Sequence, residues 1–244
     1  MGVAGVSIGA GEVRLMRTTF HTELDELMID LARMARLAAQ MMTNASIALH
    51  QTDLALAGLV IADGDQMNAM HNDAERHCVT LLALQAPVAG DLRVVIAALQ
   101  ASGHLKRMGC LARHIAVIAR LKHPNPMIAS EVRPVLARMG LLASQLAEDA
   151  ATAIEHQDPL SGCRLAVADD EVDALRRHLF TVLFADDWSH GVERAVDAAL
   201  IGRYCERFGD HAVSIARQVS YMATGRMPEP YASWTASDAA ACPP

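Results

Sequence analysis

Aromatic residues are scarce in this chain: phenylalanine, tryptophan and tyrosine make up 4% of 244 residues, although 52% of the residues are hydrophobic. A β-sheet core draws on aromatic and β-branched side chains, so this composition argues against a sheet protein. The core must instead be built from Ala, Leu, Val, Ile and Met, which favours closely packed helices. The composition therefore predicts an all-α protein.

Other absences narrow the function. The formal net charge is −7, whereas nucleic-acid-binding proteins carry an excess of basic residues. We therefore expect no nucleic-acid partner. The best apolar run, from Val94 to Leu105, is interrupted by polar residues and is shorter than the roughly 20 residues needed to span a bilayer. The first fifteen residues do not have the pattern of a signal peptide. We therefore expect no membrane-spanning segment and no signal peptide, so any contact with a membrane would be indirect.

Cysteine spacing also excludes some chemistry. The five cysteines form neither a Cys-x-x-Cys motif nor a zinc-ligand pattern, so we expect free thiols in a reducing compartment: Cys78, Cys110, Cys163, Cys205 and Cys242. No nucleophile with its base, phosphate-binding glycine loop or paired acid and base is recognisable in the sequence. We therefore predict that the protein is not an enzyme.

A motif that occurs twice is the most informative feature present. Glu206–Ala212 reads ERFGDHA, and Lys106–Ala112, one hundred residues earlier, reads KRMGCLA. Both copies continue to an Ile-Ala pair at the same spacing. An internal repeat of this kind predicts two copies of one structural unit.

Turn-forming residues divide the repeated region into six long helices. The expected helices run from about Thr18 to His50, from Asp53 to before Pro87, from about Gly90 to Leu121, from Asn125 or Ser130 to near His156, from Asp158 to before Asp186, and from after Trp188 to near Met222. Short connections between long helices predict two tandem antiparallel three-helix bundles. The expected domains are a flexible extension (1–16, with Met16 as an alternative start), a first bundle (17–123), a second bundle (124–224) and a disordered tail (225–244).

The second copy of the motif carries a candidate metal site. A projection at about 100° per residue places Glu206 and Asp210 on the face of their helix that points away from the core of their own bundle. Two carboxylates one turn apart repel each other unless a cation neutralises them, and oxygen ligands suit Mg, Mn, Fe or Ca. The alternative is a set of surface ion pairs with Arg203 and Arg207. His211 falls off this line and is expected to be a surface histidine.

The first copy lacks this chemistry. Lys106 and Cys110 replace the two carboxylates, and with Arg107 and His114 they form a cationic helix face that cannot hold a divalent cation. Cys110 is either a reactive thiol beside two cations or a packed, inert cysteine. The absence of any Glu-x-x-His sequence argues against a ferritin-like di-iron centre.

The chain resembles the PhoU family in two segments, Leu81–Arg93 (LLALQAPVAGDLR) and the ERFGDHA motif, over about residues 17–224. This resemblance implies a cytoplasmic negative regulator of phosphate uptake and of the phosphate-starvation response. The implied partners are the ATPase subunit of the phosphate ABC transporter, a phosphate sensor histidine kinase and a second copy in a homodimer. The implied sites are Glu206 and Asp210 for a divalent or iron-type metal ion in the second repeat only, and Asp91 and Arg93 for partner contact.

Simpler interpretations stay open beside these. Asp91 suits the first turn of any helix, and Arg93 suits an interhelical ion pair. Two other functions are also compatible with the sequence: a metal-dependent helical enzyme that uses Glu206 and Asp210, and a purely structural dimerising bundle without a ligand.

Overall fold

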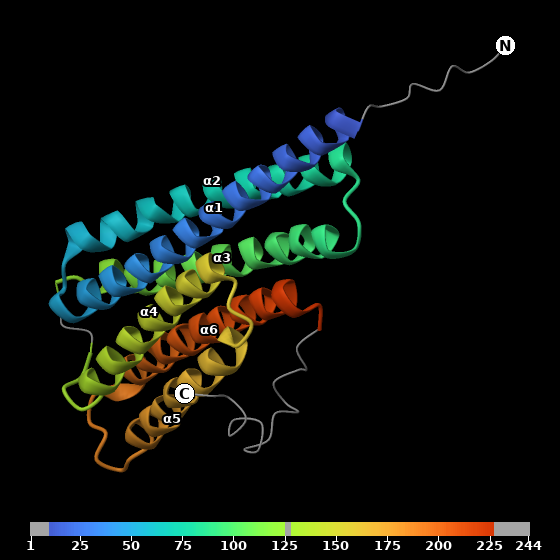
Figure 1. Ribbon diagram of the computed structural model, residues 1–244. Coiled ribbons are helices and arrows are strands. Elements are labelled where there is room, and N and C mark those ends of the chain that lie inside the picture. Colours follow the sequence, from blue (N-terminus) through green and yellow to red (C-terminus); the bar gives the residue numbers. More distant parts are fainter. Residues whose placement is uncertain (1–9, 125–127, 227–244) are drawn as a thin grey trace.

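The computed structural model describes residues 10–124 and 128–226, which form six long helices (Figure 1). The helices are α1 (Ala10–Gln51), α2 (Leu54–Gln85), α3 (Ala89–Lys122), α4 (Arg133–His156), α5 (Ser161–Leu183) and α6 (Gly191–Thr224). No strand occurs in these two described segments. The prediction of an all-α protein built from two tandem three-helix bundles is confirmed.

Two of the predicted helix boundaries rest on the expected turn chemistry. The Asp53 carboxylate accepts a hydrogen bond of 3.0 Å from the Leu56 backbone N–H, so it caps α2 as the sequence predicted. Pro87 lies in the short connection between α2 and α3, where neither helix needs its missing N–H. These local signals place the turn at each end of α2.

Three boundaries differ from the prediction. Helix α1 begins at Ala10, so residues 10–16 of the expected extension are helical, whereas residues 1–9 lie outside the described segments. Helix α4 begins at Arg133, later than expected, and Asn125 is not among the described residues. Helix α5 begins at Ser161 rather than Asp158, because the Asp158 carboxylate accepts from the Leu160 N–H at 2.9 Å and forms a turn first. Most of the predicted tail, residues 227–244, is also outside the described segments.

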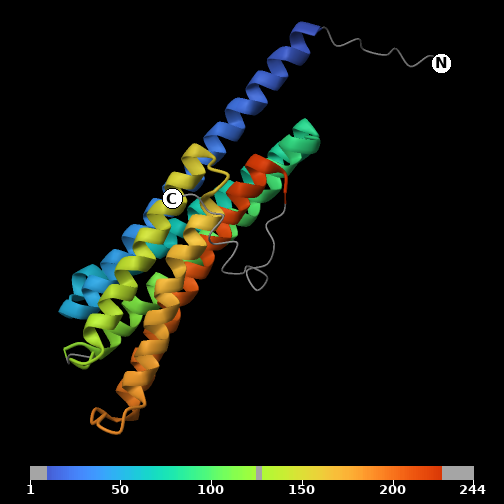
Figure 2. The ribbon, with the colours of Figure 1, turned by 60° about the horizontal axis from the view of Figure 1, so that its bottom comes forward.

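The two bundles pack side by side through four of the six helices. Helix α1 contacts α4 and helix α3 contacts α6, while α2 and α5 lie on the outside of their own bundles (Figures 1 and 2). Helices α3 and α6 run antiparallel: Arg93, near the start of α3, lies over the ring of Tyr221, near the end of α6. As a result, the α2–α3 tip and the α5–α6 tip lie at opposite ends of the molecule (Figure 1).

Small side chains let the two bundles approach closely. Alanines of α1, among them Ala35, Ala38 and Ala45, are completely buried in the core that α1 helps to form. Polar contacts bridge the bundles at the rim, including the two hydrogen bonds of 2.6 and 2.7 Å between the Arg36 guanidinium and the Glu155 carboxylate. Exposed pairs of this kind contribute at most about 1 kcal/mol each, so apolar burial holds the bundles together.

The structure shows the state of four of the five cysteines. Cys78, Cys110 and Cys205 are free, but Cys163 is disulfide-bonded, which corrects the expectation that it is a free thiol. Burial raises the pKa of Cys78 to about 11 and that of Cys205 to about 12, so both are protonated at neutral pH.

None of the described helices has a stretch both long and apolar enough to cross a membrane.

The contact of α1 with α4 at Gly140 provides a test of the packing. A Cβ atom added at Gly140 would lie 2.6 Å from Ser46 Oγ and 3.0 Å from Ser46 Cβ. We expect Gly140→Ala to lower the free energy of unfolding by about 1 kcal/mol, because the overlap outweighs the gain in helix propensity. Gly58→Ala is the matched control: nothing lies within 4 Å of its Cβ position, so it should stabilise by about 0.5–1 kcal/mol. Urea denaturation measures both, and a stabilised Gly140→Ala protein would contradict the close contact.

Candidate functional site

A close approach of α5 to α6 positions the candidate site. Gly209 of α6 has no side chain, and a Cβ atom there would overlap the Asp169 carboxylate oxygen Oδ1 of α5. This glycine therefore lets an acidic side chain from α5 lie directly on the α6 backbone. Asp169 is only 7% exposed as a result.

Four carboxylates gather around this point. Helix α5 supplies Asp169 and, one turn later, Asp173, while α6 supplies Glu206 and Asp210 at the same spacing. We call these four residues the acidic cluster. Three of them line a cavity of about 240 Å³, whose walls are Asp169, Asp173, Asp210, Val213, Ser214 and Arg217.

Asp169 has the most strongly raised pKa in the acidic cluster. Burial raises the pKa of its carboxyl group to about 7, with further contributions from the charges of Asp210, Asp173, Asp170 and Glu206. Its Oδ1 atom is buried and has no hydrogen-bond partner among the described residues. A buried carboxyl oxygen without a donor is costly, so this position favours a proton or a cation.

The other two aspartates share the same environment. Burial raises the pKa of Asp210, and the charges of Glu206 and Asp173 raise it further against the opposing effect of Arg203 and Arg207. Burial and the charge of Glu206 also raise the pKa of Asp173. The three aspartates that line the cavity beside Arg217 therefore hold their protons more tightly than isolated carboxyl groups do.

Glu206 does not lie on the outer surface, contrary to the prediction. Its side chain is buried between α5 and α6, with Oε2 at 2.8 Å from Arg176 Nε and Oε1 at 2.5 Å from Arg203 Nη1. The projection considered one buried face of α6, but α6 packs against α3, α4 and α5 at once, and α5 covers the face that was expected to be open.

The predicted ion pairs are present in part. Arg203 pairs with Glu206, and Arg207 Nε lies 4.0 Å from Asp210 Oδ2. The sequence did not identify the third arginine, Arg176 of α5, which also lies over the ring of Phe180 at 5.4 Å. Asp210, which is more exposed than Glu206, is the member of the predicted pair that lines the cavity.

His211 is not a surface histidine, which corrects the sequence prediction. It is half-buried between α3 and α6, and its Nδ1 atom lies 3.0 Å from Nδ1 of His104. Burial, followed by the neighbouring His104, Arg207 and Arg107, lowers the pKa of His211 to about 4. A projection of one helix could not foresee that a second helix covers this side chain.

The first repeat has none of the four acidic residues at the corresponding positions. A Cβ atom at Gly109 would lie 2.8 Å from Met67 Cγ, so Met67 takes the place that Asp169 has in the second repeat. His71 follows one turn later, at the position of Asp173, and burial and then the charge of Lys106 lower its pKa. Lys106 and Cys110 complete the set, so the asymmetry between the repeats extends beyond the two positions seen in the motif.

Asp91 and Arg93, predicted from the resemblance to contact a partner, lie in the first turns of α3. Arg93 points toward the end of α6, where its Cζ atom lies 5.8 Å from the centre of the Tyr221 ring. A Cβ atom at Gly225, which has φ +73°, would overlap the Arg93 guanidinium. Arg93 thus joins the two bundles by ring contact and, within residues 10–124 and 128–226, without an ion pair. The partner role of both residues stays a prediction.

The acidic cluster is suited to hard cations. Its donors are carboxylate oxygens, the ligand type preferred by Mg²⁺, Mn²⁺ and Ca²⁺, and Oδ1 of Asp169, which lies against Gly209, has no hydrogen-bond partner among the described residues. Among the described residues, no three His, Cys, Asp or Glu side chains already stand in a metal-ligand arrangement. The aspartates would therefore have to rotate toward a common point. A second signal, the Asp-x-x-x-Asp spacing of residues 169 and 173, could have revealed these donors in the sequence.

The fold and the acidic cluster together define a helical protein built from two repeats. The two repeats pack antiparallel, and only the second contains the acidic cluster. Comparison with known proteins identifies the family. The PhoU domain matches residues 31–119, within α1–α3, and residues 136–219, within α4–α6. The chain belongs to the PhoU family, as the motifs of the sequence predicted.

Relatives cover nearly the whole described region. The chain is 45% identical over 213 residues to the phosphate-specific transport system accessory protein PhoU homolog 2 of Mycobacterium tuberculosis, which covers 87% of this chain and 100% of that protein. It is 44% identical over 214 residues to PhoU homolog 1 of Mycobacterium leprae, covering 88% and 96%. The crystal structure of PhoU from Pseudomonas aeruginosa is similar with a TM-score of 0.77 and 27% identity, covering 85% of this chain and 100% of that one.

The raised pKa of Asp169 predicts a pH-dependent stability. This carboxyl group binds a proton more tightly in the folded protein than in the unfolded chain, so its contribution to stability rises as the pH falls from about 7 to about 4. In metal-free buffer, we expect Asp169→Asn to be more stable than the wild type at pH 8 by on the order of 1–3 kcal/mol, with the difference shrinking toward pH 4. Urea denaturation across this range measures it. Exposed Asp65→Asn is the control, and a constant offset between wild type and Asp169→Asn would contradict the raised pKa.

Proposed function

We propose that this protein is a negative regulator of phosphate uptake and of the phosphate-starvation response. The observation that carries the proposal is the 45% identity, over 213 residues, to a phosphate-specific transport system accessory protein. It is supported by the two PhoU repeats, which together extend from residue 31 to residue 219. The protein would act by contact with other proteins rather than by catalysis, as a cytoplasmic homodimer. Its proposed partners are the ATPase subunit of the phosphate ABC transporter and the phosphate sensor histidine kinase.

A second proposal concerns the acidic cluster, which would bind one divalent or iron-type cation in the second repeat only. Asp169, Asp173 and Asp210 would hold the ion, since they line the cavity and all three have raised pKa values. The bound charge would relieve their mutual repulsion and tie α5 to α6. Glu206 would stay behind this set, because Arg176 and Arg203 already neutralise its two oxygens.

A metal-dependent enzyme receives less support from the same geometry. Of the two residues that such an enzyme was expected to use, Glu206 is buried and paired with two arginines. A carboxylate held in this way is poorly placed to accept a proton from a substrate. A structural role for a bound cation fits the site better than a catalytic role.

The regulatory proposal predicts that deletion of the gene raises phosphate uptake and the expression of phosphate-starvation genes in phosphate-rich medium. The physical reason is the loss of a protein that restrains the transporter and the kinase. Radiolabelled phosphate uptake and transcript levels measure the effect, and a plasmid copy should restore both. Unchanged uptake and transcription, in a strain that lacks every other copy of a PhoU-type gene, would refute the proposal.

The cation proposal predicts that saturating Mn²⁺ raises the unfolding midpoint of the metal-free protein by a few degrees, on the order of 1–3 kcal/mol of stabilisation. The Asp169→Asn/Asp210→Asn protein should lose this effect and bind Mn²⁺ at least about tenfold more weakly. Lys106→Ala/Cys110→Ser, which changes the two motif positions of the first repeat, is the control and should bind as the wild type does. Equal Mn²⁺ content in all three proteins would exclude the acidic cluster as the site.

A further inference from the structure

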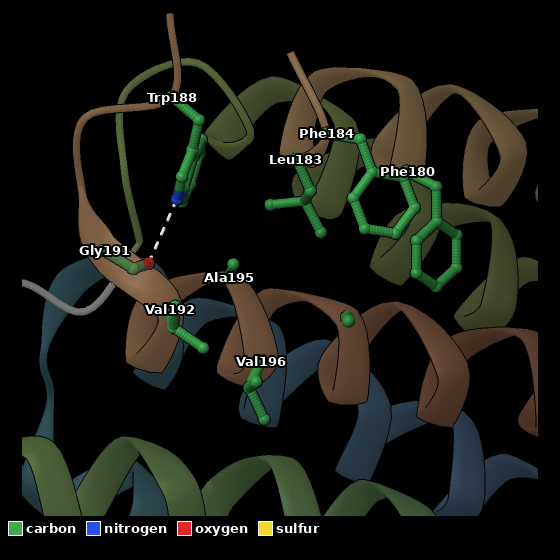
Figure 3. Close-up of a pocket in the computed structure, with 9 residues that line it drawn as sticks. Phe180, Leu183, Phe184, Trp188, Gly191, Val192, Ala195 and Val196 are labelled. Carbon is green, nitrogen blue, oxygen red and sulfur yellow. Dashed lines mark hydrogen bonds between the residues drawn. The ribbon is translucent and has the colours of Figure 1, made fainter. Parts of the chain in front are cut away.

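A second cavity lies at the tip of the α5–α6 hairpin. It has a volume of about 410 Å³ and is lined by apolar groups from the end of α5, the connecting loop and the start of α6: Phe180, Leu183, Phe184, Trp188, Gly191, Val192, Ala195, Val196 and Ala199. Figure 3 shows the α5 and loop side chains on one side of this space and α6, with Ala195 turned toward them, on the other. Three of the nine aromatic residues of the chain line this one cavity.

Apolar side chains continue from the cavity onto the open surface. Phe184 is 80% exposed and Val192 is 79% exposed, and Val196 and Leu200 follow Val192 at four-residue intervals along α6. This spacing forms a ridge that is inclined to the helix axis and rises about 12 Å along it, a little more than two helical turns. The Trp188 indole N–H donates to the Gly191 carbonyl at 3.0 Å, so the ring needs no polar partner from outside. We call the cavity and this ridge the tip surface.

The loop side of the tip surface is acidic, whereas Arg176, which lies over the Phe180 ring on the α5 side, is paired with Glu206. Asp186 and Asp187 stand in the loop directly before Trp188, are exposed, and form no ion pair within the described residues. The nearby Glu193 is neutralised by Lys122, at 2.5 Å. Arg194 is two residues from Val192 along α6 and therefore points to the opposite side of the helix from the ridge. An occupant of the tip surface would gain from basic residues that face Asp186 and Asp187.

Three other occupants fit these observations poorly. The aromatic residues after residue 226 are Tyr231 and Trp234; Trp234 can extend about 28 Å beyond Arg226, whereas α6 separates Arg226 from the cavity by about 40 Å. A second copy docked tip to tip would bring four uncompensated aspartates together in a chain of net charge −7. The same aspartates would repel an anionic membrane surface.

We infer that the tip surface is the docking site for an amphipathic helix of another protein, apolar on one face and basic at its edge. Such a helix would lie along the Val192–Val196–Leu200 ridge and place one large apolar side chain in the cavity between Phe184 and Trp188. The inference deepens the proposed function, since it rests on the view that the protein acts through protein contacts. It assigns these contacts to the second repeat at the end far from the α2–α3 tip.

The test uses the full chain with Trp234→Phe, which leaves Trp188 as the sole tryptophan. The probes are two designed 18-residue amphipathic peptides with the same leucine face and no aromatic residues, one with lysines and one with glutamates at the edge. We expect the lysine peptide to shift Trp188 emission saturably and the glutamate peptide to bind at least about tenfold more weakly. Asp186→Asn/Asp187→Asn should remove most of this difference.

Val196→Asp is the central variant and Ile96→Asp is its matched control, because Ile96 occupies the corresponding position of the first repeat. Val196 is 50% exposed and Ile96 is 37% exposed, so both changes add a surface charge to a helix. Val196→Asp should weaken binding of the lysine peptide by at least about tenfold, whereas Ile96→Asp should change it by less than about twofold. Circular dichroism and thermal unfolding check that both variants fold.

Several outcomes would overturn the inference. These are no saturable shift with either peptide, equal binding of both peptides, or equal losses in the two variants. A Trp188 shift that appears on concentrating the protein alone, together with a dimer mass in light scattering, would assign the tip surface to a second copy. A shift with phosphatidylglycerol vesicles in place of the lysine peptide would make it a lipid site. The measurement uses purified protein only, so its result is independent of the deletion phenotype that tests the proposed function.

Discussion

The close approach of each outer helix to the last helix of its repeat is the constraint on which this structure depends. Gly109 and Gly209 provide it, since neither position has room for a Cβ atom. Whatever residue faces the glycine is therefore pressed against the helix backbone and removed from water. In the first repeat that residue is Met67, which packs as a flexible apolar side chain. In the second repeat it is Asp169, and the same geometry turns a packing contact into an electrostatic one.

Burial of Asp169 then determines the chemistry around it. Asp173 and Asp210 lie on the same cavity, and each raises the pKa of the first carboxyl group further. Arg176 and Arg203 neutralise Glu206 at the back of the cluster, while the cavity is lined by three aspartates and Arg217. The two repeats thus place different side chains at similar backbone contacts: an apolar one that packs in the first repeat, and a carboxyl group with a raised pKa in the second. This difference supports assigning a ligand to the second repeat alone.

The second repeat also carries the tip surface. This surface lies at the C-terminal end of α5, whereas Asp169 of the acidic cluster lies in the first half of that helix. Arg176 links the two regions, because it pairs with Glu206 and lies over the ring of Phe180. A change in charge within the cluster would therefore act on a side chain that touches the wall of the apolar cavity. The antiparallel packing of α3 on α6 keeps the two hairpin tips apart, so each tip presents a different surface to its surroundings (Figure 1).

The sequence by itself determined the helical fold, the duplication and the family, because these follow from periodic apolar residues, turn signals such as Asp53 and Pro87, and a motif repeated after one hundred residues. It also named Asp210, which lines the cavity of the acidic cluster. It could not place Glu206 or His211, since a projection of one helix contains no information about which other helices cover it. Asp169 and Asp173 were missed although their spacing was visible, because nothing in the sequence states that α5 packs against α6 at Gly209. Only the tertiary structure decided that contact, and burial at that contact is what gives the carboxylates their chemistry.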